Sequence, residues 1–263
     1  MTLDTWDDGA AYESYVGRWS RLIAAQFVRW LAAPAESAWL DFGCGSGALA
    51  NTILAQASPR LVVGCDRSAG FIDHARGQTS DPRAQFTVAS LADLPAIAGG
   101  FDVCVSALVL NFLPNPGEAL TALAASVRRG GTIAAYVWDY ADGMQFMRVF
   151  WDAAVAHDPA AQPLDEGIRF PLCQPEPLRR TFEGAGLQSV DVRAIDVPTV
   201  FRDFDDYWQP FLGGQGPAPG YVTGLSDAHR EQLRAGIQQR LPSDDAGRIP
   251  LIARVWAVRG LVA

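Results

Sequence analysis

The chain of 263 residues contains no lysine, and all 21 of its Lys and Arg positions are therefore arginine. This absence excludes every mechanism that depends on a side-chain amine. Schiff-base chemistry, the phosphate-binding lysine of a P-loop and the Tyr-x-x-x-Lys pair of many hydride-transfer enzymes are all ruled out.

Histidine and cysteine are also scarce. The histidines His74, His157 and His229 lie far apart in the sequence, and none has a cysteine or second histidine at ligand spacing. The four cysteines form no Cys-x-x-Cys pair, and three lie in strand-like apolar runs, where cysteine behaves as a small hydrophobe. We therefore expect no metal site and a reduced, cytoplasmic protein.

Long apolar runs and positive net charge are absent as well. No run approaches the roughly 18 residues needed to span a bilayer, and the N-terminal stretch MTLDTWDDGAAYE lacks a signal-peptide pattern. The net charge is −8, a sign that repels phosphate backbones. Nucleic acid and membrane are not expected as partners, and the oligomeric state is left open.

Strand-like and helix-like segments alternate through the first two-thirds of the chain. We expect a helix at 18–33, a strand at 38–42, a helix at 47–57, a strand at 60–66, a helix at 69–77, strands at 84–90 and 101–107, a helix at 116–129 and a strand at 132–138. In that scheme, Arg128 and Arg129 end the helix just before Gly130 and Gly131. Such alternation predicts a three-layer α/β fold, a Rossmann-like sheet of seven mostly parallel strands.

The rest of the chain interrupts this rhythm with helical insertions. We expect a single domain over 1–263, made of an N-terminal helix (1–33), a core (36–139), cap or substrate elements (140–186 and 201–247) and the last strands (187–200 and 249–260). Within the insertions, helices are expected near 143–158, 175–186 and 226–241.

The stretch LDFGCGSGAL (40–49) lies where a strand passes into a helix. Gly43, Gly45 and Gly47 remove the side chains that would separate a ligand from the backbone, and Ser46 is placed to cap the next helix. The N-terminus of that helix adds N–H donors at the carboxyl edge of the sheet, where such folds bind ligands.

Two cofactor classes use a turn of this kind. The spacing Gly43-x-Gly45-x-x-Ala48 satisfies the dinucleotide fingerprint. The spacing Gly43-x-Gly45-x-Gly47 satisfies a second pattern, in which glycine occupies every other position. Asp41 favours the second, because a carboxylate is unfavourable beside a pyrophosphate and favourable beside an amino or sulfonium group.

The segment Asp41-Phe-Gly-Cys-Gly-Ser-Gly47 closely resembles motif I of class I S-adenosylmethionine-dependent methyltransferases. Further segments resemble the family in the same order and extend the likeness over most of residues 12–200: YESYVGRWSRL (12–22), Asp66, ASLADLP (89–95), FDVCVSALVLNFLPNP (101–116) and EPLRRTFEGAGL (176–187).

This resemblance implies S-adenosylmethionine as cofactor, with Asp66 on the ribose hydroxyls. It also implies an N-terminal lid helix whose arginine pairs with the cofactor carboxylate. One departure stands out, because Ser90 occupies the position of the family's adenine-binding acid, and Asp93 comes too late in the chain to replace it. The contacts implied are Tyr15, Arg18, Arg21, Asp41, Gly43, Cys44, Gly45, Gly47, Asp66, Arg67, Ser90, Leu91 and Ala107.

Several of these positions keep an alternative interpretation. Asp66 also suits the N-cap of the next helix, and the lid residues also suit a solvated helix face. We leave open whether Arg18 or Arg21 meets the carboxylate.

Aromatic residues recur at helical spacing in the insertions. Phe204, Trp208 and Phe211, with Phe146 and Phe150, are expected to pack as core or to line a site for an apolar or aromatic substrate.

A hydroxyl or amine acceptor also needs a base. Asp139 and Tyr140 after the fifth strand and His157 in the aromatic helix are the candidates. Asn111-Phe-Leu-Pro114 does not match the Asn-Pro-Pro-aromatic motif of adenine-N6 methylation, and no metal-ligating carboxylate set is visible.

The sequence therefore predicts a methyltransferase acting on a small, apolar or aromatic molecule. An NAD(P)-dependent Rossmann oxidoreductase and a non-catalytic S-adenosylmethionine-binding protein are the alternatives.

Overall fold

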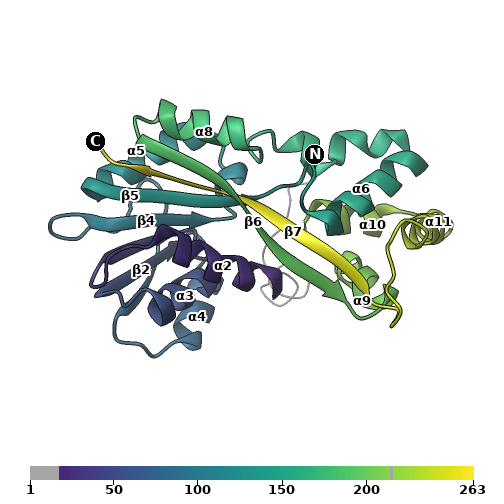
Figure 1. The fold of residues 1–263 in the computed structure, drawn as a ribbon, viewed down its shortest axis with the longest axis horizontal. Helices are drawn as coiled ribbons and strands as arrows, with labels where there is room; N and C mark the ends of the chain where they lie inside the picture. The colour runs from purple at the N-terminus through teal and green to yellow at the C-terminus, as the bar shows by residue number, and fades with distance from the viewer. Residues whose placement is uncertain (1–17, 214–215) are drawn as a thin grey trace. The chain divides into compact units, whose positions relative to one another are not determined.

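The computed structural model describes residues 18–213 and 216–263 (Figure 1). The strands are β1 (Ala38–Phe42), β2 (Leu61–Asp66), β3 (Ala84–Val88), β4 (Phe101–Ala107), β5 (Val127–Trp138), β6 (Gln188–Phe201) and β7 (Ile249–Leu261). The helices are α2 (Arg18–Leu31), α3 (Ala48–Gln56), α4 (Ala69–Gln78), α5 (Pro116–Ser126), α6 (Gln145–His157), α7 (Glu166–Arg169), α8 (Pro175–Gly184), α9 (Phe204–Trp208), α10 (Pro217–Gly224) and α11 (Asp227–Gln238). Short 3-10 turns are η2 (Leu110–Phe112), η3 (Pro159–Leu164) and η4 (Gln209–Leu212).

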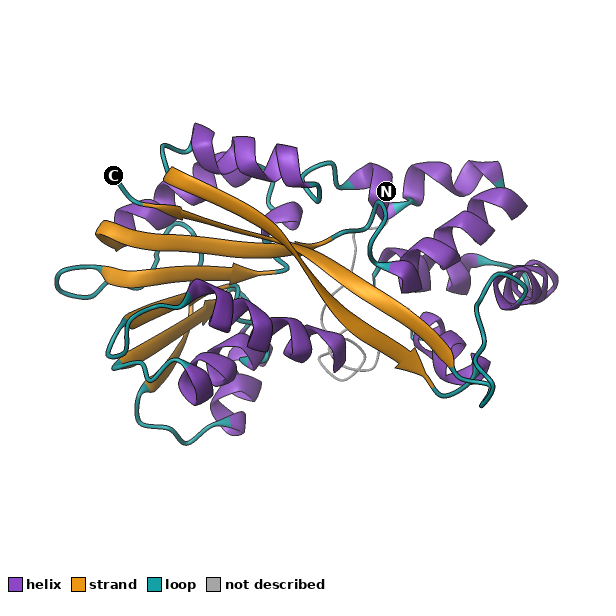
Figure 2. Cartoon of the chain, in the orientation of Figure 1, coloured by secondary structure: helices purple, strands orange, loops and turns teal. Residues whose placement is uncertain are grey.

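One sheet of seven strands runs in the order β3-β2-β1-β4-β5-β7-β6 (Figure 2). The strands from β3 to β5 pair in parallel, and β1 lies between β2 and β4, where all five of its residues are buried. Figure 1 shows α3 and α4 on one side of these strands and α5 with α8 on the other. The predicted Rossmann-like three-layer fold class is confirmed.

The last strand in the chain, β7, is inserted between β5 and β6 and runs against β5. The N–H of Gly130 at the start of β5 donates to the carbonyl of Val262, whereas the N–H of Asp139 beyond its end donates to Arg254. The residue numbers of the partners in β7 fall as the residue numbers in β5 rise, and this defines antiparallel pairing. The sheet is therefore mixed at this edge.

The predicted helix at 116–129 is wrong at its C-terminal end. α5 ends at Ser126, and Val127 begins β5, where it lies opposite Phe101. A Cβ on Gly131 would lie 2.5 Å from the side chain of Val127 and 2.9 Å from the carbonyl of Asp102. The glycines thus allow β4 and β5 to pair closely where their register is irregular. The helical periodicity of the sequence does not reveal this strand pairing.

Arg128 is therefore a strand residue and not a cation at a helix end. Its Nε donates to Asp102 at 2.6 Å, and Arg60 meets the other oxygen of the same carboxylate at 2.7 Å. These contacts, together with the N–H of Ala38, hold the pKa of Asp102 at about 2 against the opposing effect of its partial burial.

Contacts divide the chain into two compact units. Of the described residues, 20–137, 174–195 and 256–263 form the core unit, and 18–19, 138–173, 196–213 and 216–255 form the helical unit. The single-domain organisation of 1–263 stays a prediction. Among the described residues, no helix is both long and apolar enough to cross a membrane.

Candidate functional site

The loop between β1 and α3 is held against the end of β2 by its backbone. The N–H groups of Gly43 and Cys44 both donate to the carbonyl of Cys65, at 2.8 and 3.0 Å. The φ angles of Gly43, Gly45 and Gly47 are +72°, +50° and +84°, in the left-handed region that side chains other than glycine rarely adopt. This conformation requires glycine three times in five residues.

The three glycines differ in what surrounds them. A Cβ on Gly43 would lie 2.5 Å from the side chain of Val109, and a Cβ on Gly47 would lie 3.2 Å from Ala75. A Cβ on Gly45 would meet no heavy atom of the described chain within 4 Å. Gly45 therefore presents bare backbone to open space, whereas the other two serve packing.

Asp66 at the end of β2 faces this loop. Its carboxylate accepts hydrogen bonds from the N–H of Gly45 at 3.1 Å and of Ser68 at 2.9 Å, one on each oxygen. The N-cap of α4 is Ser68, whose hydroxyl accepts from Phe71, so Asp66 is not the cap. Each carboxylate oxygen of Asp66 retains a second lone pair for a ligand.

Asp41 is fully buried at the end of β1. Among the described residues, neither of its carboxylate oxygens has a hydrogen-bond partner that meets normal geometry. Burial raises the pKa of Asp41 to about 7; the N–H of Ala50 opposes this shift, and the charge of Asp66 adds to it. A buried carboxylate without a partner is costly, and a cationic group would stabilise its ionised form.

The thiol of Cys44 lies buried in this loop beside two carboxylates. Burial, together with the charges of Asp41 and Asp66, raises the pKa of Cys44 far above its ordinary value. Because only the thiolate reacts, this shift disfavours nucleophilic chemistry at Cys44, and its contact with the cofactor stays a prediction.

The loop after β3 closes on itself through Ser90 and Asp93. The N–H and the hydroxyl of Ser90 both donate to the same oxygen of Asp93, at 2.7 and 2.6 Å. The turn thus places the carboxylate of Asp93 against Ser90, and the cofactor contact of Ser90 stays a prediction.

β4 ends at Ala107, and the loop after it begins with Leu108, a residue in the left-handed region with φ +60°. The N–H of Leu108 donates to Tyr136, and Val109 lies against Gly43. Among the described residues, the buried side-chain amide nitrogen of Asn111 has no hydrogen-bond partner. From the sequence, Asn111 was considered only as a mismatch to the motif of adenine-N6 methylation. That mismatch gives no sign that its amide nitrogen is buried without a partner.

The remaining predicted cofactor residues are placed as follows. Tyr15 and the side chain of Arg18 lie outside the described residues. Arg21 is exposed on α2, Arg67 is exposed after β2, and Leu91 is half-buried next to Ser90. Their roles stay predictions.

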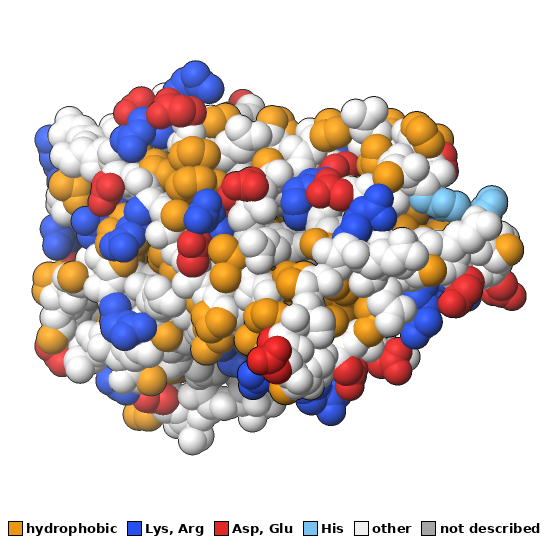
Figure 3. Space-filling model, turned by 45° about the vertical axis from the view of Figure 1, so that its right-hand side comes forward, with side chains coloured by type: hydrophobic (Ala, Val, Ile, Leu, Met, Phe, Trp, Pro, Cys, Tyr) orange, Lys and Arg blue, Asp and Glu red, His pale blue; other side chains and the backbone are white. Residues whose placement is uncertain are grey.

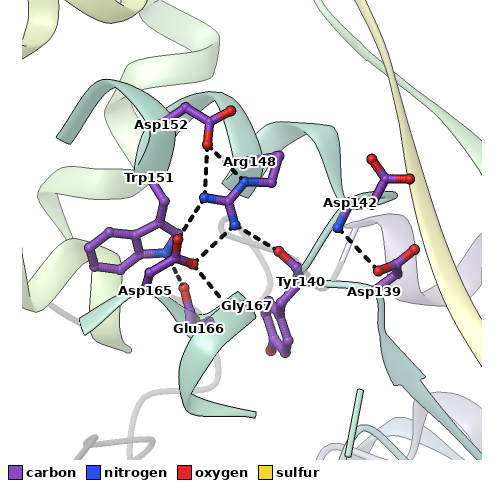
Figure 4. A network of polar contacts seen from close by, with 9 residues as sticks. All are labelled: Asp139, Tyr140, Asp142, Arg148, Trp151, Asp152, Asp165, Glu166 and Gly167. Carbon is purple, nitrogen blue, oxygen red and sulfur yellow. Dashed lines mark hydrogen bonds and ion pairs between the residues drawn. The ribbon is translucent and has the colours of Figure 1, made fainter. Parts of the chain in front are cut away.

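In the helical unit, Asp139 and Tyr140 are held by a polar network (Figure 4). One oxygen of buried Asp139 accepts from the N–H of Asp142 at 3.2 Å, and burial raises the pKa of Asp139 despite that bond. The carbonyl of Tyr140 accepts from Arg148 at 3.0 Å, and its ring lies 5.6 Å from that of Phe170. A backbone N–H thus holds the carboxylate of Asp139, whereas the side chain of Arg148 holds the main chain at Tyr140.

Arg148 is the centre of that network. It makes two parallel hydrogen bonds to Asp165, at 3.0 and 2.7 Å, and a further ion pair with Asp152 at 2.9 Å. Next to it, the indole N–H of Trp151 donates to buried Glu166 at 2.6 Å. This pairing joins α6 to the segment around α7.

His157 is exposed at the end of α6, and its ring centroid is 5.6 Å from that of His229 on α11. It is therefore a surface residue of the helical unit.

The predicted substrate-binding aromatics divide into two groups. Phe146, Phe150 and Phe211 are fully buried and pack on one another, with 4.5 Å between the ring centroids of Phe150 and Phe211. Phe204 and Trp208 stack on α9 with 6.4 Å between centroids. Trp208 also borders a hollow of about 280 Å³ that is lined by Trp208, Leu212, Asp227, Arg230, Glu231 and Arg234.

Comparison with known proteins gives the class of this core. Residues 40–135 match a family model described as a methyltransferase domain. The chain is 31% identical over 108 residues to tRNA (carboxymethyluridine(34)-5-O)-methyltransferase alkbh8 of Xenopus tropicalis, covering 40% of this chain and 16% of that protein. It is 40% identical over 99 residues to the ribosomal protein L11 methyltransferase of Paraburkholderia phymatum, covering 36% of this chain and 30% of that protein.

A solved structure extends the likeness over nearly the whole fold. The phosphoethanolamine N-methyltransferase 2 of Haemonchus contortus, in complex with phosphomonomethylethanolamine and S-adenosylhomocysteine, superimposes with a TM-score of 0.58. Identity is 13%, and the match covers 97% of this chain and 57% of that one. Residues 40–135 are thus a methyltransferase domain with the class I fold, the kind that uses S-adenosylmethionine. The match decides between the two cofactor classes that the glycine spacing allows.

Proposed function

We propose that the protein transfers a methyl group from S-adenosylmethionine to a small, apolar or aromatic acceptor. The chain spans less than a third of the length of each of these two relatives. The proposed activity is therefore argued from the residues of this chain and not from the activities of the relatives. The observation that carries the proposal is Asp41, a fully buried carboxylate without a hydrogen bond of normal geometry to the described chain. The cofactor has two cationic groups, an ammonium and a sulfonium, and either would stabilise such a carboxylate.

Two further features fit the same group. The open space at Gly45 allows a ligand to approach the backbone, and the free lone pairs of Asp66 suit the two hydroxyls of a ribose. A dinucleotide would instead place a pyrophosphate near the buried carboxylate of Asp41, with like charges opposed.

When bound, S-adenosylmethionine supplies a methyl group that is activated by positive charge on sulfur. The chain's part is then to hold the donor through Asp41, Gly45 and Asp66, to orient the acceptor and to exclude water. If the acceptor is a hydroxyl or ammonium group, a base must also take its proton. Asp139, Tyr140 and His157 remain the proposed candidates, and burial of Asp139 raises its pKa toward the range of a useful base.

The choice of a small acceptor rests on charge and on aromatic content. Figure 3 shows Arg and acidic side chains interspersed over the face that it presents, and the net charge of the chain is −8. Such a balance does not favour a phosphate backbone. Phe204 is half-buried, and Trp208 lines the hollow, so these two members of the aromatic set are the ones proposed to meet an aromatic molecule.

The decisive test is calorimetric titration with S-adenosylmethionine, S-adenosylhomocysteine and NAD(H) in parallel. We expect micromolar binding of the first two and none of NAD(H). An acceptor screen that measures S-adenosylhomocysteine release should then include phenols, amines, bulk tRNA and ribosomal protein. Turnover only with the last two would overturn the small-molecule acceptor. Tight cofactor binding without turnover on any class would support the non-catalytic alternative.

A further inference from the structure

His157 and His229 are brought together by two helices that pack against each other. His157 is the last residue of α6, and His229 lies in the first turn of α11. Their ring centroids are 5.6 Å apart, and the ring planes are inclined at 72°. Spacing along the chain predicts no metal site, because it does not reveal that these two rings meet.

The backbone fixes the position of both residues. The N–H of His229 donates to the hydroxyl of Ser226, the N-cap of α11, at 3.3 Å. After His157, the N–H of Asp158 donates to the carbonyl of Ala154 at 2.8 Å and closes the last turn of α6. Only the side-chain torsions of the two histidines are left to adjust, so little conformational freedom is lost when both rings bind one ligand.

Both imidazoles are available to a ligand from solution. The two residues are exposed, and their ring nitrogens take part in no hydrogen bond or ion pair with the described residues. A neutral imidazole presents one acceptor nitrogen, which is the atom that binds a transition metal. The pair thus offers two such nitrogens.

The distance between the rings suits a shared metal ion. In a histidine site, the ion lies about 2.1 Å from a ring nitrogen and hence about 3.2 Å from the ring centroid. Two rings at a tetrahedral angle then have centroids about 5.2 Å apart, and a small rotation of the side chains would close the observed 5.6 Å to that value. Because each lone pair lies in the plane of its ring, the ion must lie where the two planes meet, and parallel rings would have no such place.

The rest of the coordination shell has to come from water. Within residues 18–213 and 216–263, no group of three His, Cys, Asp or Glu side chains is arranged to hold a metal ion. Imidazole is a ligand of Zn²⁺, Ni²⁺ and Cu²⁺, whereas Mg²⁺ and Ca²⁺ prefer oxygen ligands. The pair therefore fits an exchangeable transition metal ion with two imidazole ligands and water.

We propose that His157 and His229 form a surface site for a divalent transition metal ion, which joins the end of α6 to the start of α11. This site goes beyond methyl transfer and does not depend on it. α11 also contributes Arg230 and Arg234 to the hollow that Trp208 borders. A bound ion therefore holds in place a helix that forms part of the wall of that hollow.

Calorimetric titration of the full chain with ZnCl₂, without S-adenosylmethionine, tests the site directly. His157→Asn and His229→Asn each remove one ring and keep a polar side chain. Each should weaken Zn²⁺ binding by about tenfold or more, because the second imidazole is held at high effective concentration beside the first. His74→Asn removes an exposed histidine on α4, the third histidine of the chain, and should leave the affinity unchanged.

Thermal melts provide a second measurement. The folded chain holds the two rings together and the unfolded chain does not, so ZnCl₂ should raise the melting temperature of the wild type and of His74→Asn. It should not raise that of His157→Asn or His229→Asn. If either of these two fails to fold, electron paramagnetic resonance of Cu²⁺ bound to the wild type counts the coordinating imidazoles, and two are expected.

Metal binding is the readout because His157 is also a candidate base, so turnover would not separate its two roles. Loss of Zn²⁺ binding in both variants, with His74→Asn unaffected, supports the site. Unchanged affinity in folded His157→Asn or His229→Asn overturns it, as does a wild type that binds no Zn²⁺ or a Cu²⁺ spectrum with a single imidazole ligand.

Discussion

The backbone amide of Gly45 donates a hydrogen bond of 3.1 Å to the carboxylate of Asp66. Through this bond, the acid at the end of β2 holds the loop that follows β1 at its most open point. A single side chain thus shapes the loop and keeps lone pairs for a ligand, so loss of Asp66 should act on cofactor binding in two ways.

Asp66→Ala is predicted to weaken binding of S-adenosylhomocysteine by about 1–3 kcal/mol, because it removes hydrogen bonds to the ribose and releases Gly45. Calorimetry measures the change, and Asp73→Ala on α4 is the matched acidic control. Unchanged affinity in folded Asp66→Ala would refute the ribose assignment.

Replacement of Gly43 by alanine should mainly reduce stability, whereas replacement of Gly45 by alanine should mainly reduce ligand binding. Gly43→Ala places a Cβ 2.5 Å from Val109 and should lower the melting temperature strongly. Gly45→Ala meets open space and should cost only about 1 kcal/mol of backbone strain, while it blocks the ligand. Thermal melts and titrations check both, and Gly43→Ala combined with Val109→Ala should recover part of the lost stability. Equal loss of stability in the two single variants would contradict this account.

Asp41 should make the free protein less stable as pH rises from about 4 to about 7. Burial raises the pKa of Asp41 to about 7, against about 3.9 in an unfolded chain. Between these values the folded state holds a proton that the unfolded state has lost, so unfolding is favoured as pH increases. Above the folded pKa, the penalty is constant and at most about 4 kcal/mol, three pKa units at 1.36 kcal/mol each.

Asp41→Asn isolates this effect, because it removes the titrating group and keeps the shape. The wild type should lose stability relative to Asp41→Asn between about pH 4 and about pH 7, measured by urea unfolding. Parallel curves for the two proteins would show that Asp41 is not protonated in the free state. Because a cationic ligand favours the charged form, cofactor binding near neutral pH should release a proton in the wild type and none in Asp41→Asn.

Arg148→Met should lower the free energy of unfolding by about 3 kcal/mol, because it leaves the nearly buried carboxylate of Asp165 without its partner. Arg202→Met is the matched control. Arg202 is 82% exposed and 3.7 Å from Asp206, so its loss should change stability by no more than about 0.5 kcal/mol. Similar values for the two variants in urea unfolding would mean that the network around Arg148 adds little.

Several elements could be predicted from the sequence because their causes are local. The apolar run of β1, the glycines at 43, 45 and 47 and the helix that begins at Ala48 all follow from neighbours in the chain. The strand–helix alternation that follows also implied the parallel sheet, since right-handed crossovers leave few other arrangements.

The end of α5 could not be predicted in this way. Helical periodicity continues through Val127, but pairing with Phe101 and the close approach at Gly131 place that segment in β5. Both contacts come from strands elsewhere in the chain, and their packing free energy outweighs local helix propensity.

The sequence by itself determined the class of fold and the glycine-rich loop, because hydrophobic period and backbone freedom are properties of adjacent residues. Only the tertiary structure decided that Asp41 is buried without a hydrogen bond of normal geometry to the described residues, that Asp66 holds Gly45, and that Ser90 donates to Asp93. Those relations depend on which strands lie side by side and on where a turn closes, and no spacing along the chain encodes them.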